Sequence, residues 1–125
     1  MRGVSDRGRQ AWMLGLRAEF FGVWYLRAKG YRIIARRFKC PVGEIDLIAR
    51  RGDVLVFIEV KARRTVDEAA HALSAKQRRR IERASEAFRL SRPDFNRYGV
   101  RFDVLLVGRG IGFNHVQDAW RPNSI

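Results

Sequence analysis

The chain has 125 residues, of which 46% are hydrophobic, so it is long enough for one domain with a single core and too short for two. No apolar run approaches the roughly 20 residues of a membrane-spanning helix, and the single cysteine, Cys40, excludes an internal disulfide. The formal net charge of +13 predicts a polyanionic partner, because Arg and Lys side chains placed against phosphates release condensed counterions.

The predicted elements begin after residues 1–10, which lack the apolar segment of a secretory signal and are expected to form a flexible basic tail. A first helix is expected over 11–29, where apolar residues recur at spacings of three and four and Gly30 follows as a stop. Three strands are expected over 31–38, 43–49 and 54–62, and Gly52-Asp53 is a plausible turn between the last two.

A long helix is expected over 67–90, and Pro93 prevents its continuation. Two further strands are expected over 100–108 and 111–120. The order αβββαββ predicts an α/β domain over 11–120, with a mixed central β-sheet flanked by helices. The helix before the fourth strand is long enough for a crossover, which allows the third and fourth strands to be parallel.

Charged residues interrupt the apolar strands on either side of the predicted turn. A turn centred on Gly52-Asp53 places Asp46 opposite Glu59 and Glu44 opposite Lys61. Because side chains alternate between the faces of a sheet, these four residues share one face. The other face is uniformly apolar, with Ile45, Leu47, Ala49, Val54, Val56, Ile58 and Val60.

Opposed residues have Cβ atoms roughly 4.5 to 5.5 Å apart, so Asp46 and Glu59 bring two carboxylates together. Like charges at this separation destabilise the pair unless a cation lies between them. An all-oxygen site suits Mg²⁺ or Mn²⁺ rather than zinc, and Lys61 adds an ammonium group beside it. This combination suits metal-assisted hydrolysis of a phosphodiester. The alternative is a surface salt bridge, which does not explain two opposed acids within apolar strands. For Glu44, opposite Lys61, two interpretations remain open: an ordinary salt bridge or a place at the rim of the site.

The run "GEIDLIA…VFIEVKAR", with "AEFFGVWYLRAKGY" before it, resembles the YraN family of bacterial proteins over about residues 11–107. Asp46 followed by Glu59-Val60-Lys61 is similar to the core of the PD-(D/E)XK nuclease superfamily, which includes the archaeal Holliday junction resolvases. Ile45 stands where the superfamily name has a proline. The resemblance implies a restriction-endonuclease-like domain of three layers.

The resemblance also implies a role for each matching residue. Asp46, Glu59 and the backbone carbonyl of Val60 would bind the metal, and Lys61 would orient or activate the attacking water. Glu19 matches a glutamate that many members place near the metal, often through water. Gln77 matches a polar position that lines the cleft in some relatives.

The basic residues that follow the motif are candidates for a phosphate-binding rim, although such a run is usually a solvated face. They are Arg63, Arg64, Lys76, Arg78 and Arg79. Structural or surface roles are expected for His71 and His115, and Asp103 is expected to pair with a buried arginine. The three tryptophans, Trp12, Trp24 and Trp120, are expected to pack in the core or at its edge, with base stacking as the alternative.

Together these features predict a cytoplasmic, Mg²⁺- or Mn²⁺-dependent endonuclease that acts on DNA, with branched DNA favoured by the resolvase resemblance. A symmetric homodimer fits this prediction, because a resolvase needs two active sites. No membrane association is expected. The alternatives are a module that binds nucleic acid without cutting it and an adaptor that docks on an acidic protein.

Overall fold

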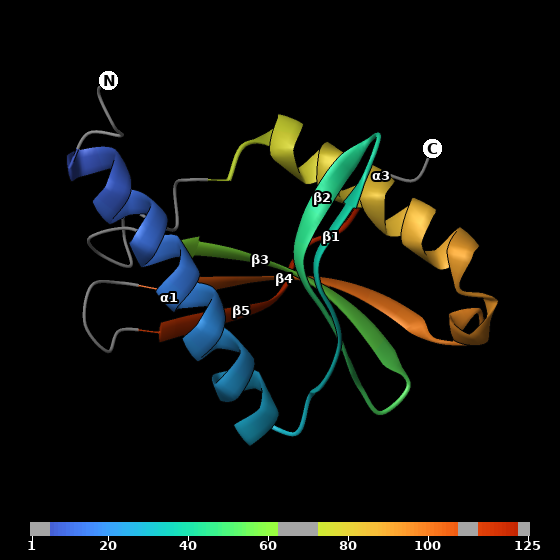
Figure 1. The fold of residues 1–125 in the computed structure, drawn as a ribbon. Coiled ribbons are helices and arrows are strands. Elements are labelled where there is room, and N and C mark those ends of the chain that lie inside the picture. Colours follow the sequence, from blue (N-terminus) through green and yellow to red (C-terminus); the bar gives the residue numbers. More distant parts are fainter. Residues whose placement is uncertain (1–5, 63–72, 108–112, 123–125) are drawn as a thin grey trace.

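The computed structural model describes residues 6–62, 73–107 and 113–122, and within them a five-stranded sheet lies at the centre of the fold (Figure 1). Helix α1 spans Asp6–Ala28 and helix α3 spans Ala75–Ser91, followed by a short 3₁₀ helix at Pro93–Phe95. The strands are β1 Arg32–Cys40, β2 Gly43–Arg51, β3 Val54–Ala62, β4 Gly99–Val107 and β5 Phe113–Trp120.

The strands lie in sequence order across the sheet, from β1 at one edge to β5 at the other. Strands β3 and β4 run parallel, joined by the segment that contains α3, and every other neighbouring pair is antiparallel. The predicted mixed sheet and its order αβββαββ are therefore confirmed.

The two helices cover opposite faces of the sheet, because side chains that alternate along each strand enter two separate apolar clusters. Helix α1 contributes Ala18, Val23 and Leu26 to one cluster, which also contains Leu47, Ala49, Val56, Ile58, Leu105 and Val107. Helix α3 contributes Ile81, Ala84 and Phe88 to the other, with Ile48, Leu55, Phe57, Phe102, Val104 and Leu106. The fold is thus a helix–sheet–helix sandwich of three layers.

Both helices begin at positions that differ from the expected ones. Helix α1 begins at Asp6, so the second half of the expected flexible tail is helical. Helix α3 begins only at Ala75, because Ser74 is its N-cap. The Ser74 hydroxyl accepts a hydrogen bond from the Gln77 N–H at 3.1 Å, and the Gln77 side chain accepts one from the Ser74 N–H at 2.9 Å. Residues 67–72 of the expected helix lie outside the described part of the chain.

Two glycines are required by the path of the backbone around β2. Gly52, in the turn between β2 and β3, has φ +58°, a left-handed conformation that favours glycine. At Gly43, where β2 begins, a Cβ atom would lie 2.7 Å from the carbonyl oxygen of Arg80 in α3. The absence of a side chain there lets the start of β2 approach the helix backbone.

Neither of the described helices has a stretch that is both long and apolar enough to cross a lipid bilayer.

Candidate active site

The candidate site lies where strands β2 and β3 separate. Their ladder follows the predicted register from Arg51–Val54 to Leu47–Ile58 and ends there. Beyond this point a side chain replaces the backbone contact between the strands. The Oδ2 atom of Asp46 accepts a hydrogen bond of 2.8 Å from the backbone N–H of Val60. Asp46 therefore bridges the two strands through its side chain.

The end of the ladder corrects two details of the predicted hairpin. Glu44 is not paired with Lys61, because β2 has left β3 at this point and Glu44 lies opposite Lys39 of β1. Ile45 does not share a face with Leu47, because Ile45 packs in the α3 cluster and Leu47 in the α1 cluster. The regular alternation of β2 therefore breaks at Asp46, which explains why a uniform face was the wrong expectation there.

The structure brings Glu59 and Asp46 together, as the spacing predicts. Burial, a hydrogen bond with the Asp46 side chain and the negative charge of Asp46 together raise the pKa of Glu59 to about 9. The positive charge of Lys61 acts in the opposite direction and favours the ionised form of Glu59. Two acids thus meet at the fork between the strands, within the electrostatic influence of an ammonium group.

Glu19 is connected to this region by Arg37, a residue that the sequence did not single out. Its Oε1 atom lies 2.9 Å from Nε of Arg37, in an ion pair that ties α1 to the edge strand β1. Glu19 is mostly buried, whereas half of the Arg37 side chain is exposed. Arg37 has φ 52°, unusual for a residue that is not glycine. The charges of Asp46 and Glu44 also raise the pKa of Arg37, after the larger effects of its hydrogen bond with Glu19 and the charge of Glu19.

The register of β1 and β2 explains this position of Arg37. Arg36 pairs with Leu47 and Phe38 with Ile45, so Arg37 falls opposite Asp46. The sequence signal would have been the turn between Cys40 and Gly43, because pairs counted outward from it place Arg37 opposite Asp46 before the register shifts between Ile33 and Ala35. Glu19 is therefore linked to Asp46 and Glu59 by an arginine between them.

The acids at the fork fit the divalent cation that the resemblance to the PD-(D/E)XK nucleases implies. Two carboxylates that face each other raise each other's cost of ionisation, and a divalent cation between them relieves this repulsion. The Oδ2 atom of Asp46 accepts the hydrogen bond from the Val60 N–H, which fixes the orientation of the carboxylate toward the fork. Within the described ranges no group of three or more His, Cys, Asp or Glu side chains could hold a metal ion. A site here would thus combine the two carboxylates with backbone oxygen and water.

The predicted basic rim is only partly within the described residues. Lys76, Arg78 and Arg79 are exposed on the first turns of α3, and the guanidinium carbon of Arg78 lies 5.9 Å from the centre of the Trp120 ring. The Gln77 side chain is part of the N-terminal cap of α3, where it accepts a hydrogen bond from the Ser74 N–H. Arg63 and Arg64 lie outside the described residues.

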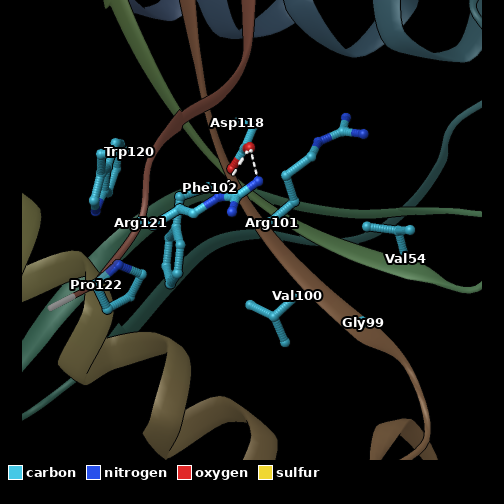
Figure 2. A pocket seen from close by; sticks show the side chains of 9 residues that line it. All are labelled: Val54, Gly99, Val100, Arg101, Phe102, Asp118, Trp120, Arg121 and Pro122. Atoms are coloured by element: carbon cyan, nitrogen blue, oxygen red, sulfur yellow. Dashed lines mark hydrogen bonds and ion pairs between the residues drawn. The ribbon is translucent and has the colours of Figure 1, made fainter. Parts of the chain in front are cut away.

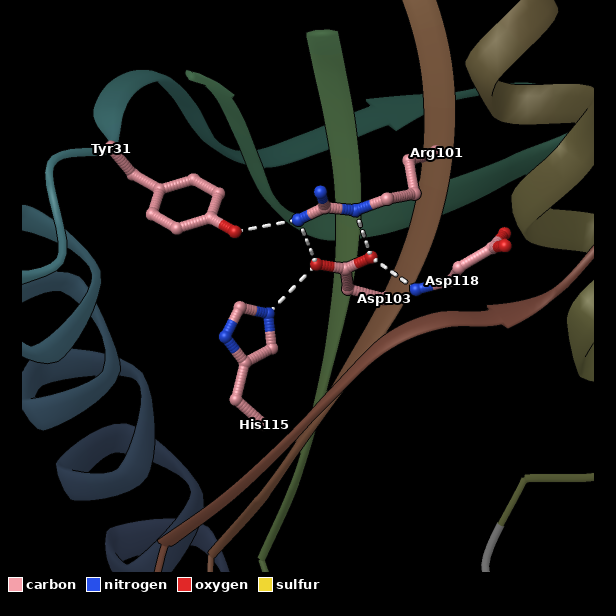
Figure 3. A network of polar contacts seen from close by, with 5 residues as sticks. All are labelled: Tyr31, Arg101, Asp103, His115 and Asp118. Carbon is pink, nitrogen blue, oxygen red and sulfur yellow. Dashed lines mark hydrogen bonds and ion pairs between the residues drawn. The ribbon is translucent and has the colours of Figure 1, made fainter. Parts of the chain in front are cut away.

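A second polar cluster holds a buried acid on the α1 face of the sheet (Figure 3). The Asp103 carboxylate is fully buried and accepts two hydrogen bonds of 2.8 Å from Arg101, which also donates to the Tyr31 hydroxyl. Nε2 of His115 lies 2.7 Å from Oδ2 of the carboxylate, and the Asp118 N–H donates a hydrogen bond of 2.9 Å to Oδ1. Burial alone would raise the pKa of Asp103, but these hydrogen bonds outweigh it and hold the pKa below its usual value.

This cluster confirms that Asp103 pairs with an arginine and gives His115 a structural position. Among the other residues, Trp120 is buried and stacks on Phe102, as expected. Trp24 contradicts the expectation of core or edge packing, because 56% of it is exposed. Trp12 and His71 have no described side-chain environment.

A pocket of about 420 Å³ opens elsewhere on the molecule, beside the starts of β3 and β4 and the end of β5 (Figure 2). Its lining includes Val54, Arg101 and Trp120, and an ion pair between Arg121 and Asp118 lies at its wall. Val54 and Glu59 are well separated along β3, and none of the predicted catalytic residues lines this pocket. The candidate site is therefore the fork and not this pocket.

Comparison with known proteins agrees with this architecture. The profile of the uncharacterised protein family UPF0102 matches residues 18–107. A UPF0102 protein of Parvibaculum lavamentivorans is 49% identical over 121 residues, which cover 97% of this chain and 91% of that protein. A UPF0102 protein of Nitrobacter winogradskyi is 50% identical over 97 residues, 78% of this chain and 82% of that protein.

Among solved structures, the fold is similar to that of Hjc from Archaeoglobus fulgidus, a Holliday junction resolvase. The TM-score is 0.56 and the identity 21%, over 84% of this chain and 78% of that one. The chain therefore has the restriction-endonuclease-like fold that the sequence predicted.

Proposed function

The chain belongs to the uncharacterised protein family UPF0102, and from this premise and its resolvase-like fold we propose that it is a metal-dependent endonuclease that hydrolyses DNA phosphodiesters. The observation that carries the proposal is the contact between Asp46 and Glu59 beside Lys61. One fold can support many functions, so the proposed activity is inferred from these side chains and not from the architecture alone. Two partly buried acids held against each other stabilise a fold poorly, but they suit a cation that binds phosphate.

We propose that Asp46, Glu59 and the backbone carbonyl of Val60 hold one Mg²⁺ or Mn²⁺. The hydrogen bond from the Val60 N–H fixes the orientation of the Asp46 carboxylate before any ligand arrives. When bound, the cation would neutralise charge on the phosphate and lower the pKa of an attacking water.

The other charged residues supply the fixed positive charge that the reaction needs. The positive charge of Lys61 acts on Glu59 and lowers its pKa, and we propose that this ammonium group orients an attacking water and stabilises negative charge in the transition state. Glu19, proposed as part of the catalytic set, acts through Arg37 and holds that guanidinium beside Asp46.

The substrate that we propose is branched or structured DNA, because the protein of similar fold is a Holliday junction resolvase. Sequence-independent affinity would come from the net charge of +13 and the exposed cations around the site. On α3 these are Lys76, Arg78 and Arg79, and Arg63, Arg64 and the polar Gln77 complete the proposed contact set. Because a branch point presents two strands to be cut, a symmetric homodimer would supply the second active site.

Incubation with supercoiled, linear and four-way-junction DNA, in Mg²⁺, Mn²⁺ or EDTA, tests the proposal. We expect cleavage with either cation, none in EDTA, and a loss of activity in Glu59→Gln and in Lys61→Ala. The matched control is Glu86→Gln, which changes an exposed acid on α3 and should cut as the wild type does.

The same incubation separates the proposal from its alternatives. Binding that weakens steeply with salt, without cleavage under any condition, would instead identify a module that binds nucleic acid. If the protein has no DNA affinity at moderate salt, an adaptor for an acidic protein surface becomes the better explanation of the positive charge.

A further inference from the structure

Helix α1 carries three aromatic side chains that remain largely exposed to solvent. Phe20, Phe21 and Trp24 are 53%, 52% and 56% exposed, and we call them the aromatic stripe. The rings of Phe20 and Phe21 meet edge to face, with centroids 5.5 Å apart. Single exposed apolar residues are ordinary on a protein surface, but three bulky aromatic residues within five positions of one helix are not.

Cations border the stripe at both ends. Arg17 and Arg27 are exposed at helical spacings of three and four from its members, so they lie on the same side of α1. The guanidinium carbon of Arg27 lies 5.2 Å from the centre of the Trp24 ring, and more than half of Trp24 is exposed even so. The acid among residues 17–28 is Glu19, which Arg37 neutralises. The surface is therefore aromatic and positively charged.

The stripe lies on the same helix as Glu19 but on its exposed side, away from the buried residues Ala18, Val23 and Leu26 that pack on the sheet. Glu19 precedes Phe20 directly, and Trp24 follows five positions later, about 7.5 Å along the helix axis. The edge strand β1, to which Arg37 belongs, adds exposed cations at Arg32, Arg36 and Lys39. A single strand bound along the exposed side of α1 would thus meet aromatic rings and cations together.

We infer that the aromatic stripe binds unpaired bases of DNA. Base stacking on aromatic rings combined with arginine contacts to phosphate is the usual chemistry of single-strand recognition. This inference rests on the proposed function and narrows its substrate to DNA that has a single-stranded or unstacked segment. In fully paired DNA the base faces are stacked on one another, so a duplex would contact only the arginines that flank the stripe.

The size of the stripe argues against a protein partner. An aromatic side chain presents on the order of 200 Å², so three at about half exposure offer roughly 300 Å². A standard protein interface needs about 800 Å² from each partner. The flanking arginines would also repel the same surface of a second copy.

Binding in EDTA tests the inference without any cleavage. Fluorescence anisotropy would compare a labelled oligothymidine with a duplex of equal length, for the wild type and for the variant F20A/F21A/W24A. We expect the variant to lose about tenfold or more in affinity for oligothymidine and to bind the duplex as the wild type does. Leu90→Ala, which truncates an exposed apolar residue on α3, is the matched control and should change neither affinity.

A second variant keeps the test independent of folding. Trp24→Phe preserves a ring for stacking, so it should retain affinity for oligothymidine but lose the part of the quenching of tryptophan fluorescence that Trp24 contributes. Equal quenching in the wild type and in Trp24→Phe would overturn the inference.

The remaining outcomes separate this inference from the proposed function. If F20A/F21A/W24A binds oligothymidine as the wild type does, or loses affinity for the duplex to the same extent, the stripe does not bind unpaired bases. The proposed nuclease activity is not affected by either result. If sedimentation shows a wild-type dimer that the variant converts to a monomer, the stripe is instead a contact between two copies. If the wild type binds no DNA at all, both proposals fail.

Discussion

The Oδ2 atom of Asp46 lies 2.8 Å from the backbone nitrogen of Val60, the residue between Glu59 and Lys61. One carboxylate thus does two things at the fork between β2 and β3. It replaces the backbone hydrogen bond that is missing where the strands separate, and it interacts with Glu59. The structural and the proposed catalytic roles of Asp46 can therefore be separated by substitution.

We expect Asp46→Asn to keep the fold and to lose cleavage, because an amide oxygen can still accept the hydrogen bond from Val60 but binds a divalent cation poorly. Asp46→Ala should lose cleavage and also about 1 kcal/mol of unfolding free energy, because the Val60 N–H loses its partner. Urea unfolding and a cleavage assay on both variants check this. Equal stability of the two variants would show that the hydrogen bond contributes little.

Glu59 should make the stability of the metal-free protein depend on pH. Its pKa is raised from 4.5 to about 9 in the folded chain, first by burial and then by Asp46. The unfolded chain therefore loses this proton near pH 4.5, whereas the folded chain keeps it until the pH approaches 9. The stabilisation is complete below pH 4.5 and is lost as the pH rises through this interval, by at most about 1.4 kcal/mol per pH unit.

Glu59→Gln should abolish this pH dependence, because glutamine does not ionise. Urea unfolding in EDTA at a series of pH values measures the slope, and the variant should be more stable than the wild type at alkaline pH. Glu86→Gln, at an exposed position of α3, should keep the slope of the wild type. The same slope in Glu59→Gln would mean that another group is responsible.

The ion pair between Glu19 and Arg37 should matter more for cleavage than for stability. Half of the Arg37 side chain is exposed, so solvent screens the pair and its loss should hardly change the midpoint of urea unfolding. Glu19→Gln and Arg37→Gln should each reduce cleavage, because Glu19 positions the guanidinium beside Asp46. If the two residues act as one unit, the double variant should cut about as slowly as the slower single variant. Multiplied losses in the double variant would show independent roles.

The Asp103 cluster should be a main source of stability. Asp103→Asn leaves the guanidinium of Arg101 without its buried carboxylate, which should cost on the order of 3 kcal/mol of unfolding free energy. Because the pKa of Asp103 is lowered, its contribution is present above the ordinary carboxyl pKa and lost as the pH falls through the folded value. Urea unfolding near neutral pH measures the loss.

An exposed pair provides the control for this change. Arg92 and Asp94 have the same two-hydrogen-bond geometry at the surface, so Asp94→Asn should leave the unfolding midpoint close to that of the wild type. A loss in Asp103→Asn no larger than in Asp94→Asn would contradict the importance of burial.

Much of the fold follows from local signals in the sequence. The predicted bounds of β3 are confirmed, because the turn at Gly52-Asp53 fixes its start and a β-branched, apolar segment follows. The order of elements follows in the same way, and so does the register of β2 and β3 near Gly52, since the turn fixes it. The start of α3 was misplaced, because a capping box at Ser74 and Gln77 was not recognised among helix-forming residues.

What the sequence alone determined is that Asp46 and Glu59 meet near Lys61, because strand pairing counts residues outward from a turn. Only the tertiary structure decided the environment of these three side chains. The fork, the break of alternation at Asp46 and the approach of Arg37 depend on β1 and α1, which lie against β2 through contacts that no local pattern encodes. The exposure of Trp24 is likewise decided by which side of α1 rests on the sheet.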